Sequence, residues 1–367
     1  MSILSDLWNQ FQVSLFPRLE CVLEAPLSEK QKQFVQVVEI VRVERYIASP
    51  HAQWMGRREK DRRSIARAFI AKAVFDLPTT EMLIEALNQQ PSLRRLCGFE
   101  TKNSIPSAST FSRAFAKFAK CNLGDRIHEA LVKTYVGDKV VVHLSQDSTE
   151  VVAREKPVAK AKAKPEVKPK YKRGRPKKGE IRPAPEPSRI EKQLKQTPEA
   201  ALAELPYVCD IGSKKDSKGY AHSWTGWKAH IGWADGGIPL KVLTTSASLH
   251  DSQAAIPMMR IMAREVISLY DLMDSAYDAA AIHRASKELG HVPIIDPNPR
   301  RGASVPLEPD RVRRFKERST AERGNGRLKD EFGLRHLRVR GHPKAHMHIM
   351  FGVMVLFADQ LVKLFSG

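Results

Sequence analysis

A carboxylate placed between two cations is the feature of this 367-residue sequence best suited to chemistry. Glu322 follows Arg318 by four residues and precedes Lys329 by seven. An α-helix turns by about 100° per residue, so the three positions would fall within roughly 60° of one line along a helix. An Arg–Glu pair at this spacing is also common as a solvated ion pair worth about 0.2–0.5 kcal/mol. The three residues are therefore a candidate site, and an ordinary solvated ion pair is the alternative.

The stretch around these residues resembles the Y-x2-R-x3-E-x6-K signature of insertion-sequence DDE transposases of the IS-four and IS-five groups. Arg318, Glu322 and Lys329 keep the spacing of that signature, and Phe315 stands where it has tyrosine. The resemblance covers roughly residues 138–365, apart from a central insertion.

This resemblance implies two catalytic aspartates upstream, each at the end of a strand. The apolar run at 140–144 ends just before Asp147, and a second run leads to Asp274. An aspartate that follows a strand is usually a turn residue, so only the resemblance singles these two out. It implies that Asp147, Asp274 and Glu322 are both the catalytic residues and the metal ligands.

The implied reaction is metal-dependent phosphodiester cleavage at transposon ends, followed by strand transfer into target DNA. Mg²⁺ prefers oxygen ligands, and two ions about 3.5–4 Å apart can activate a nucleophile and stabilise a leaving oxygen. We therefore expect two Mg²⁺ ions, for which Mn²⁺ can substitute. The expected partners are double-stranded DNA, as terminal inverted repeats and as target, and a second copy of the chain in a homodimer on paired ends.

The same resemblance implies DNA-binding roles for the residues around the glutamate. Arg318 and Lys329 would bind phosphates of the transposon end, where arginine can bind bidentately. Phe315 lacks the tyrosine hydroxyl, so stacking on a base is the contact left to it. The short interval between Asp274 and Glu322 leaves no room for the large β insertion of some relatives, which argues against their hairpin-forming route.

Two alternative functions remain open. A catalytically silent, transposase-derived DNA-binding regulator would keep the basic surface but would not need all three acids. A metal-dependent nuclease would keep the acids but would not join DNA ends. Strand-transfer products distinguish a transposase from both.

The charge of the chain indicates a polyanionic partner. The formal net charge is +20 and the pI is about 9.8. Residues 154–195 hold 16 Lys and Arg against 5 Asp and Glu, which is +11, and the remaining 20 − 11 = +9 is still basic. Because the basic charge is not confined to one segment, a nucleic-acid partner explains it better than a charged tail that only aids solubility. Each phosphate contact would make binding salt-dependent.

Cysteine usage and hydropathy indicate a cytoplasmic, nucleoid-associated protein. The four scattered cysteines form no C-x-x-C pair, which argues against a structural zinc site and a disulfide framework. No basic stretch followed by an apolar core begins the chain, so we expect no secretory signal. No run approaches the roughly 18 apolar residues that span a membrane, so we expect no membrane association.

Residues 154–206 are expected to be a disordered basic insertion, because they are rich in Lys and Pro and poor in apolar residues. The sequence Arg173-Gly174-Arg175-Pro176 within it resembles the core of an AT-hook. An extended Arg-Gly-Arg segment can lie in a narrow A·T minor groove, where the potential is most negative. A basic linker that contains these four residues by chance is the alternative.

Residues 1–137 are expected to form a helical N-terminal domain that binds DNA or mediates dimerisation. Apolar residues recur there at helical spacing, and the candidate N-caps are Thr79 and either Ser107 or Ser109. Phe111, Phe115 and Phe118 form a stripe that fits a core better than stacking on bases. The likeness of this half to the helical N-terminal region of insertion-sequence transposases supports the DNA-binding role.

Residues 138–367 are expected to form an α/β catalytic domain with a ribonuclease-H-like fold, interrupted by the insertion. The predicted order is a first strand, a hairpin around 235–237, a helix at 251–265, a second short strand, a helix, a third strand and the helix that bears Glu322. Such a fold would bring the three acids to one edge of the sheet. Gly324 and Gly326 conflict with the last helix at a cost of about 1 kcal/mol each relative to Ala, which suggests a close approach of backbone or DNA there.

The other polar candidates are expected to be structural. Asp251 and Asp278 follow strand-like stretches and precede helices, so both are predicted helix caps. A catalytic role for His250 is the alternative there. The C-terminal histidines match no standard spacing of metal ligands.

Overall fold

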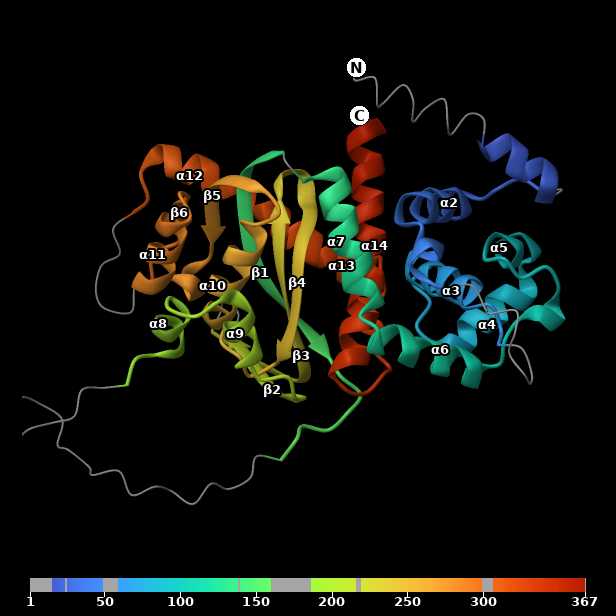
Figure 1. Cartoon of the computed structure of the whole chain (residues 1–367), viewed down its shortest axis with the longest axis horizontal. Helices are drawn as coiled ribbons and strands as arrows, with labels where there is room; N and C mark the ends of the chain where they lie inside the picture. The colour runs from blue at the N-terminus through green and yellow to red at the C-terminus, as the bar shows by residue number, and fades with distance from the viewer. Residues whose placement is uncertain are drawn as a thin grey trace, which may run out of the picture.

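The fold is seen in a computed structural model, which describes residues 15–23, 25–48, 59–137, 139–159, 186–215, 219–298 and 306–366. The AT-hook-like residues Arg173, Gly174, Arg175 and Pro176 lie outside the described residues. Figure 1 shows the arrangement of the remaining elements.

The N-terminal half is helical, as predicted. Residues 15–23 form a first helical stretch. The helices that follow are α2 (Glu29–Val41), α3 (Arg62–Val74), α4 (Thr80–Gln89), α5 (Pro91–Leu96), α6 (Ala108–Lys120) and α7 (Leu123–Tyr135). Thr79 caps α4 by accepting a hydrogen bond from the Met82 amide, which confirms one predicted cap. Phe111, Phe115 and Phe118 are all buried, so the predicted core stripe is also confirmed.

The C-terminal half holds a mixed six-stranded sheet. Its strands are β1 (Val140–Val152), β2 (Asp210–Lys215), β3 (Ala221–Ala234), β4 (Ile238–Ser246), β5 (Ile267–Met273) and β6 (Val292–Ile295). Strand β3 runs antiparallel to β1, β2 and β4, whereas β5 lies between β1 and β6 and runs parallel to both. The predicted α/β class is confirmed, and the strand arrangement is consistent with a ribonuclease-H-like fold.

Helices pack around this sheet. They are α8 (Arg189–Gln193), α9 (Pro198–Ala203), α10 (Ser252–Met262), α11 (Ala280–Glu288), α12 (Pro309–Phe315), α13 (Ser319–Asp330) and α14 (His342–Ser366). A 3₁₀ turn at Lys316–Arg318 joins α12 to α13, so the chain stays helical through the signature stretch. The hairpin predicted around Asp235 is present between β3 and β4.

The prediction of disorder across 154–206 is wrong for residues 186–206. Helices α8 and α9 form there, and Ser188 and Thr197 cap them. Arg260 of α10 donates hydrogen bonds to backbone carbonyls of Gln193, Leu194 and Gln196 between them. The prediction used the average composition of residues 154–206, which the Lys- and Pro-rich part dominates. Residues 186–206 have helix caps and apolar contacts of their own, which an average does not register.

The first strand is longer than predicted. It continues past Leu144 to Val152, so Asp147 lies within β1 rather than just after it. The strand continues because β3 pairs with residues 145–152, a partner that the local sequence does not reveal. At the start of the strand, Val140 and Val142 are exposed although they belong to the apolar run.

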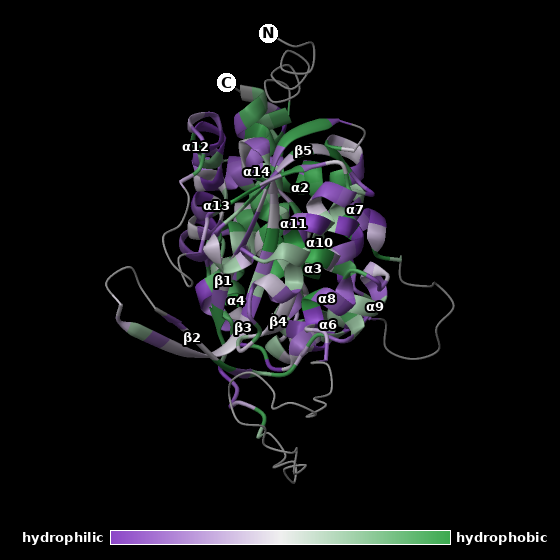
Figure 2. Ribbon diagram, turned by 90° about the vertical axis from the view of Figure 1, so that its left-hand side faces the viewer, coloured by the Kyte–Doolittle hydropathy of each residue, from purple (hydrophilic) through white to green (hydrophobic). Residues whose placement is uncertain are grey.

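Helix α14 connects the two halves of the molecule. It contacts α2, α3, α6 and α7 of the N-terminal half and β4 of the sheet (Figure 1). One hydrophobic core therefore includes Phe34 and Phe111 from the N-terminal helices, Trp233 from the sheet and Phe357 from α14. Hydrophobic residues gather in the interior around α14, whereas α12 is mostly hydrophilic (Figure 2).

The expectation that no apolar stretch is long enough to span a membrane is wrong for α14. Residues His342–Phe365 have the length and hydropathy of a membrane span. About 67% of the apolar window is buried within the fold, however, as in the core helix of a globular protein. Its length and hydropathy are therefore accounted for by its central position in the core.

The C-terminal histidines make structural hydrogen bonds. His342 contacts the Thr244 carbonyl at 2.8 Å, and His348 contacts the Gly333 carbonyl at 2.9 Å. His346 bridges the Thr244 hydroxyl and Asp125. Asp278, predicted to cap α11, instead contacts His283 at 3.0 Å and accepts from the Asn298 amide. The helix itself begins after Ala279 without a side-chain cap.

Candidate active site

Two of the predicted acids lie side by side because of the strand register. Strands β1 and β5 are parallel, and Ser145 pairs with Leu272. Two residues further along each chain stand Asp147, still within β1, and Asp274, directly after β5. The sheet thus brings together two carboxylates that are far apart in the sequence.

Both carboxyl groups are shifted toward the neutral form. Burial is the largest cause and raises the pKa of Asp147 to about 6, with the charge of Asp274 adding to the shift and Arg318 opposing it. Burial likewise raises the pKa of Asp274, against a hydrogen bond from the Ala276 amide and the charge of Arg318. Desolvated carboxylates near one another favour the binding of a cation.

Arg318 connects the third acid to Asp147. Its guanidinium donates a hydrogen bond to Glu322 Oε1, and its Nη1 atom lies 3.9 Å from Asp147 Oδ1. Glu322 stands on the first turn of α13, with 57% of its side chain exposed. The arginine therefore lies between Asp147 and Glu322. Its predicted role, a contact with a DNA phosphate, did not anticipate these two carboxylate contacts.

The donor set suits a hard divalent cation. Asp147, Asp274 and Glu322 offer carboxylate oxygens, and Arg318 supplies one positive charge among them. In the part of the chain that the structure describes, no three acidic, histidine or cysteine side chains are close enough to enclose a metal ion. The acids fit such an ion chemically, and Glu322 would have to turn from Arg318 to ligate it.

The other two signature residues point elsewhere. Lys329 lies further along α13, and its Nζ atom is 3.3 Å from Glu150 of β1, three residues beyond Asp147. The ring of Phe315 lies beside Arg318, 5.7 Å from the guanidinium carbon. Lys329 is thus on the sheet-facing side of the helix, while Phe315 and Arg318 are neighbours.

Asn325 is a site residue that the sequence interpretation missed. Its Nδ2 atom donates to Asp147 Oδ2 at 2.9 Å, and its buried Oδ1 atom has no hydrogen-bond partner among the residues that the structure describes. It stands three residues after Glu322, so both side chains lie on neighbouring parts of one helix surface. That spacing was the only signal in the sequence that could have identified it.

The neighbouring Gly324 explains how α13 approaches the sheet. A Cβ atom at this position would lie 2.4 Å from the ring of Trp233 on β3. Only glycine allows this approach, which confirms the predicted close backbone contact. The same expectation is wrong for Gly326, because no atom of the described residues lies within 4 Å of the corresponding position.

Asp251 is a second missed residue, and its predicted role as a helix cap is wrong. It makes no cap hydrogen bond, and its Oδ1 atom instead lies 2.8 Å from Lys228 Nζ. Burial acts to raise its pKa, but His230 and Lys228 outweigh burial and the net shift is downward. Its negative charge contributes to the raised pKa of Asp274, so it is part of the same electrostatic cluster.

His230 and His250 each have a hydrogen-bond partner outside the three acids. Buried His230 contacts the Thr245 hydroxyl at 2.9 Å, and burial lowers its pKa to about 4. His250 contacts the Ser252 hydroxyl at the start of α10, at 2.8 Å. Neither contact involves Asp147, Asp274 or Glu322, so both histidines have structural partners.

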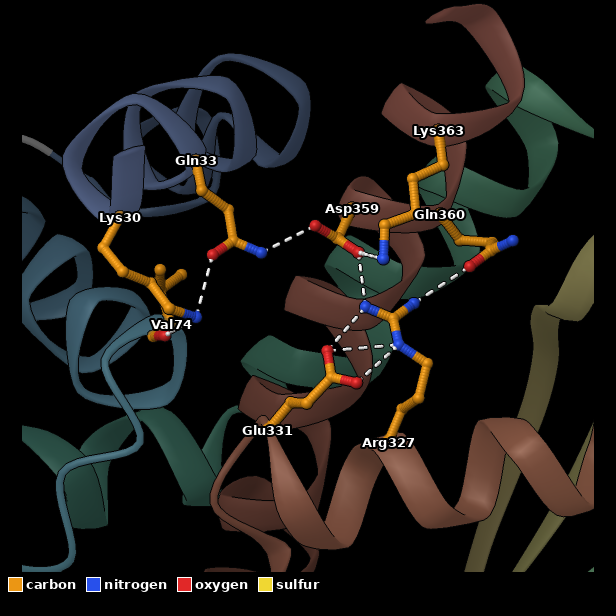
Figure 3. A network of polar contacts seen from close by, with 8 residues as sticks. All are labelled: Lys30, Gln33, Val74, Arg327, Glu331, Asp359, Gln360 and Lys363. Atoms are coloured by element: carbon orange, nitrogen blue, oxygen red, sulfur yellow. Dashed lines mark hydrogen bonds and ion pairs between the residues drawn. The ribbon is translucent and has the colours of Figure 1, made fainter. Parts of the chain in front are cut away.

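A polar network fixes the middle of α13 (Figure 3). Arg327 donates to both carboxylate oxygens of Glu331 and, through Nη2, to Asp359 Oδ2 of α14 at 2.6 Å. Gln33 of α2 donates to the other oxygen of Asp359, also at 2.6 Å. The helix that carries Glu322 is thereby tied to α14 and, through Asp359, to the N-terminal helices.

Comparison with known protein families gives two matches. Residues 143–358, more than half of the chain, match the Transposase DDE domain, and residues 24–117 match a second model, Transposase domain (DUF772). A search among curated proteins and among solved structures finds no match. The first match spans β1, β5 and α13, the elements that carry the three acids. The chain belongs to the DDE transposase family.

Proposed function

We propose that Asp147, Asp274 and Glu322 are the catalytic acids of this DNA transposase, an enzyme that cleaves DNA and transfers strands. The observation that supports this proposal most directly is the register of β1 with β5, which aligns Asp147 with Asp274. Arg318, which contacts both Asp147 and Glu322, links the third acid to this pair. The presence of all three acids argues against a silent regulator.

The family implies dependence on a divalent metal, and we propose Mg²⁺, as two ions that Mn²⁺ can replace. Asp147, Asp274 and Glu322 would be its ligands, and the metal would supply activation of the attacking oxygen and charge stabilisation at the leaving oxygen. Asn325 would hold the carboxylate of Asp147 in place through its amide. Lys228 would neutralise Asp251 beside the site.

DNA is the partner of a transposase, and we propose specific contacts to it. Arg318 would bind a phosphate at the transposon end once its carboxylate partners engage metal. Lys329 would release Glu150 to bind a phosphate further along, and Phe315 would stack on a base. Among the described residues, Lys329 has one ion-pair partner, Glu150, and Phe315 contacts the guanidinium of Arg318. Arg318 has two acidic partners, Asp147 and Glu322.

The remaining assignments rest on the resemblance and on composition. We propose that the protein acts as a homodimer on paired terminal inverted repeats, with residues 1–137 contributing DNA binding or dimerisation. Residues 138–367 would form the ribonuclease-H-like catalytic domain of an IS-four- or IS-five-like transposase. A cytoplasmic, nucleoid-associated location follows from the DNA substrate and the net charge of +20.

The AT-hook-like residues would add A·T-biased binding in the minor groove. The motif Arg173-Gly174-Arg175-Pro176 is the basis of this proposal. Replacing Arg173 and Arg175 by Ala should weaken binding to an A·T-rich duplex more than to a G·C-rich duplex. Equal affinity of the wild type and the variant for the A·T-rich duplex would exclude the hook.

Incubation of the wild-type protein with a plasmid carrying both transposon ends, target DNA and Mg²⁺ tests the function. We expect nicks at the ends and products in which the freed 3′ ends are joined to target. Nicks without joined products would favour a nuclease. Tight binding without cleavage, under conditions in which a related transposase cuts, would favour a DNA-binding regulator.

A further inference from the structure

A cavity with basic walls lies between the N-terminal helices and the segment that follows α13. Its volume is about 680 Å³. Helices α3, α4 and α6 form one side, and residues 332–340 with the start of α14 form the other. Five cationic side chains line it: Lys72, Arg154, Arg338, Arg340 and Lys344. The one carboxylate among the lining residues is Glu81, so the walls carry an excess of positive charge.

Four of these cations lack an acidic partner. Among the described residues, no ion pair or side-chain hydrogen bond engages Arg154, Arg338, Arg340 or Lys344. Arg335, only three residues before Arg338, contrasts with them because it binds Asp330 at 2.7 Å. Unpaired cations that converge on one cavity repel one another, and an anion would relieve that repulsion.

Lys72 reinforces this electrostatic imbalance. Its ammonium group has one long hydrogen bond, 3.4 Å, to the Pro78 carbonyl. Burial is the main reason that its pKa falls to about 8, and Arg338 lowers it further, against the charges of Asp76 and Glu81. A bound anion would compensate the burial of this charge.

The cavity is connected to the active site by the strand and the helix that carry the catalytic acids. Arg154 follows Asp147 by seven residues, and β1 extends to Val152, so the two are about 23 Å apart along the strand at about 3.3 Å per residue. Lys329 contacts Glu150 between them. The segment with Arg338 and Arg340 follows α13 directly.

We propose that this cavity binds backbone phosphates of the DNA duplex whose end occupies the active site. Duplex DNA rises about 3.4 Å per base pair, so the contacted phosphates would lie about seven base pairs from the cleaved bond. The position on the duplex rests on the proposed catalytic function, whereas the phosphate contact itself does not. Arg154, Arg338 and Arg340 are exposed and so accessible to a duplex backbone, whereas Lys72 is largely buried.

Fluorescence anisotropy with a labelled duplex of arbitrary sequence, in EDTA, tests the phosphate contact separately from catalysis. The double variant Arg338→Ala/Arg340→Ala should reduce the slope of log affinity against log salt by about 1.8, because each lost phosphate contact contributes about 0.9. Arg264→Ala/Arg284→Ala is the matched control with the same charge change. Arg264 pairs with Glu199 of α9, and Arg284 pairs with Glu288 of α11. The salt slope of this control should therefore equal that of the wild type.

The salt slope decides the inference. An unchanged slope in a double variant that retains the wild-type melting temperature would overturn it. Competition with pyrophosphate forms a second arm. If pyrophosphate binding weakens in the variant while duplex binding does not, the cavity is a site for small anions and the DNA assignment is wrong.

A third arm locates the contact on an end-containing duplex. Uncharged methylphosphonate linkages about seven base pairs from the cleaved bond should weaken wild-type binding and leave the double variant unaffected. Sensitivity at a different distance, with the slope changed as expected, would retain the phosphate site but contradict the placement of the DNA on Asp147 and Asp274.

Discussion

The most informative single residue is Asp147, whose carboxyl group is buried beside another acid. Its pKa is raised to about 6 from the model-compound value of 3.8, chiefly by burial. For an acid whose pKa is higher in the folded state, ionisation destabilises the fold. The contribution of neutral Asp147 to the free energy of unfolding is therefore fully present below about pH 4 and is lost as the pH rises through about 6.

Asp147→Asn should therefore stabilise the metal-free protein at about pH 8 and not at about pH 4. The expected gain is on the order of 3 kcal/mol, since the pKa is raised by about two units and one unit corresponds to about 1.4 kcal/mol. Urea unfolding in EDTA across this pH range measures it. Asp310→Asn, at an exposed position paired with Arg313, is the control and should show no such trend. Equal stability of wild type and Asp147→Asn at pH 8 would contradict the buried environment of the carboxylate.

The same residue shows what the sequence could and could not predict. The resemblance directed attention to Asp147, Asp274 and Glu322, but the local pattern ended the strand too early. Ser145, Gln146 and Thr149 are buried polar residues, and they continue β1 because neighbouring strands pair with its backbone. Asn325 and Asp251 were missed for the same reason, since their importance depends on partners distant in sequence.

At the scale of elements, the helix α13 is held by its closest contact with the sheet. Gly324 packs against the Trp233 ring, whereas none of the described residues lies within 4 Å of a Cβ atom placed at Gly326. Gly324→Ala should destabilise the protein by about 1–3 kcal/mol through overpacking. Gly326→Ala should instead stabilise it by about 0.5–1 kcal/mol, because alanine favours a helix. Urea unfolding distinguishes the two, and equal effects at both positions would contradict the packing of α13 on β3.

Helices α8 and α9 mark another limit of prediction from the sequence. Lys- and Pro-rich composition identified the insertion but not the point where order resumes. Ile190 and Leu194 pack on a small core with Ile256 of α10, which a composition average cannot register. The caps at Ser188 and Thr197 were present in the sequence and could have placed both helices.

At the scale of the molecule, the N-terminal helices and the catalytic sheet share one core through α14. Arg327 strengthens this connection by binding Asp359, which Gln33 also binds. Arg327→Ala should destabilise the whole protein by about 2–4 kcal/mol, because it leaves Asp359 nearly buried with only Lys363 as a cationic partner. Unfolding should remain a single transition, as expected for one core.

The control for this prediction is Arg323→Ala on the same helix. Arg323 is exposed and has one hydrogen bond, to the Thr320 hydroxyl at 3.2 Å. Its loss should change the free energy of unfolding by less than about 0.5 kcal/mol. Two separate transitions for the wild type, seen by fluorescence and circular dichroism, would contradict the shared core.

The central claim is that Asp147, Asp274 and Glu322 form one catalytic site, and end cleavage by single variants tests it most directly. Asp147→Asn, Asp274→Asn and Glu322→Gln should each lose cleavage of transposon ends in Mg²⁺ while still binding the DNA. Glu317→Gln, at an exposed acid one turn before Glu322, should cleave like the wild type. Wild-type cleavage by any of the three acid variants would contradict the assigned site.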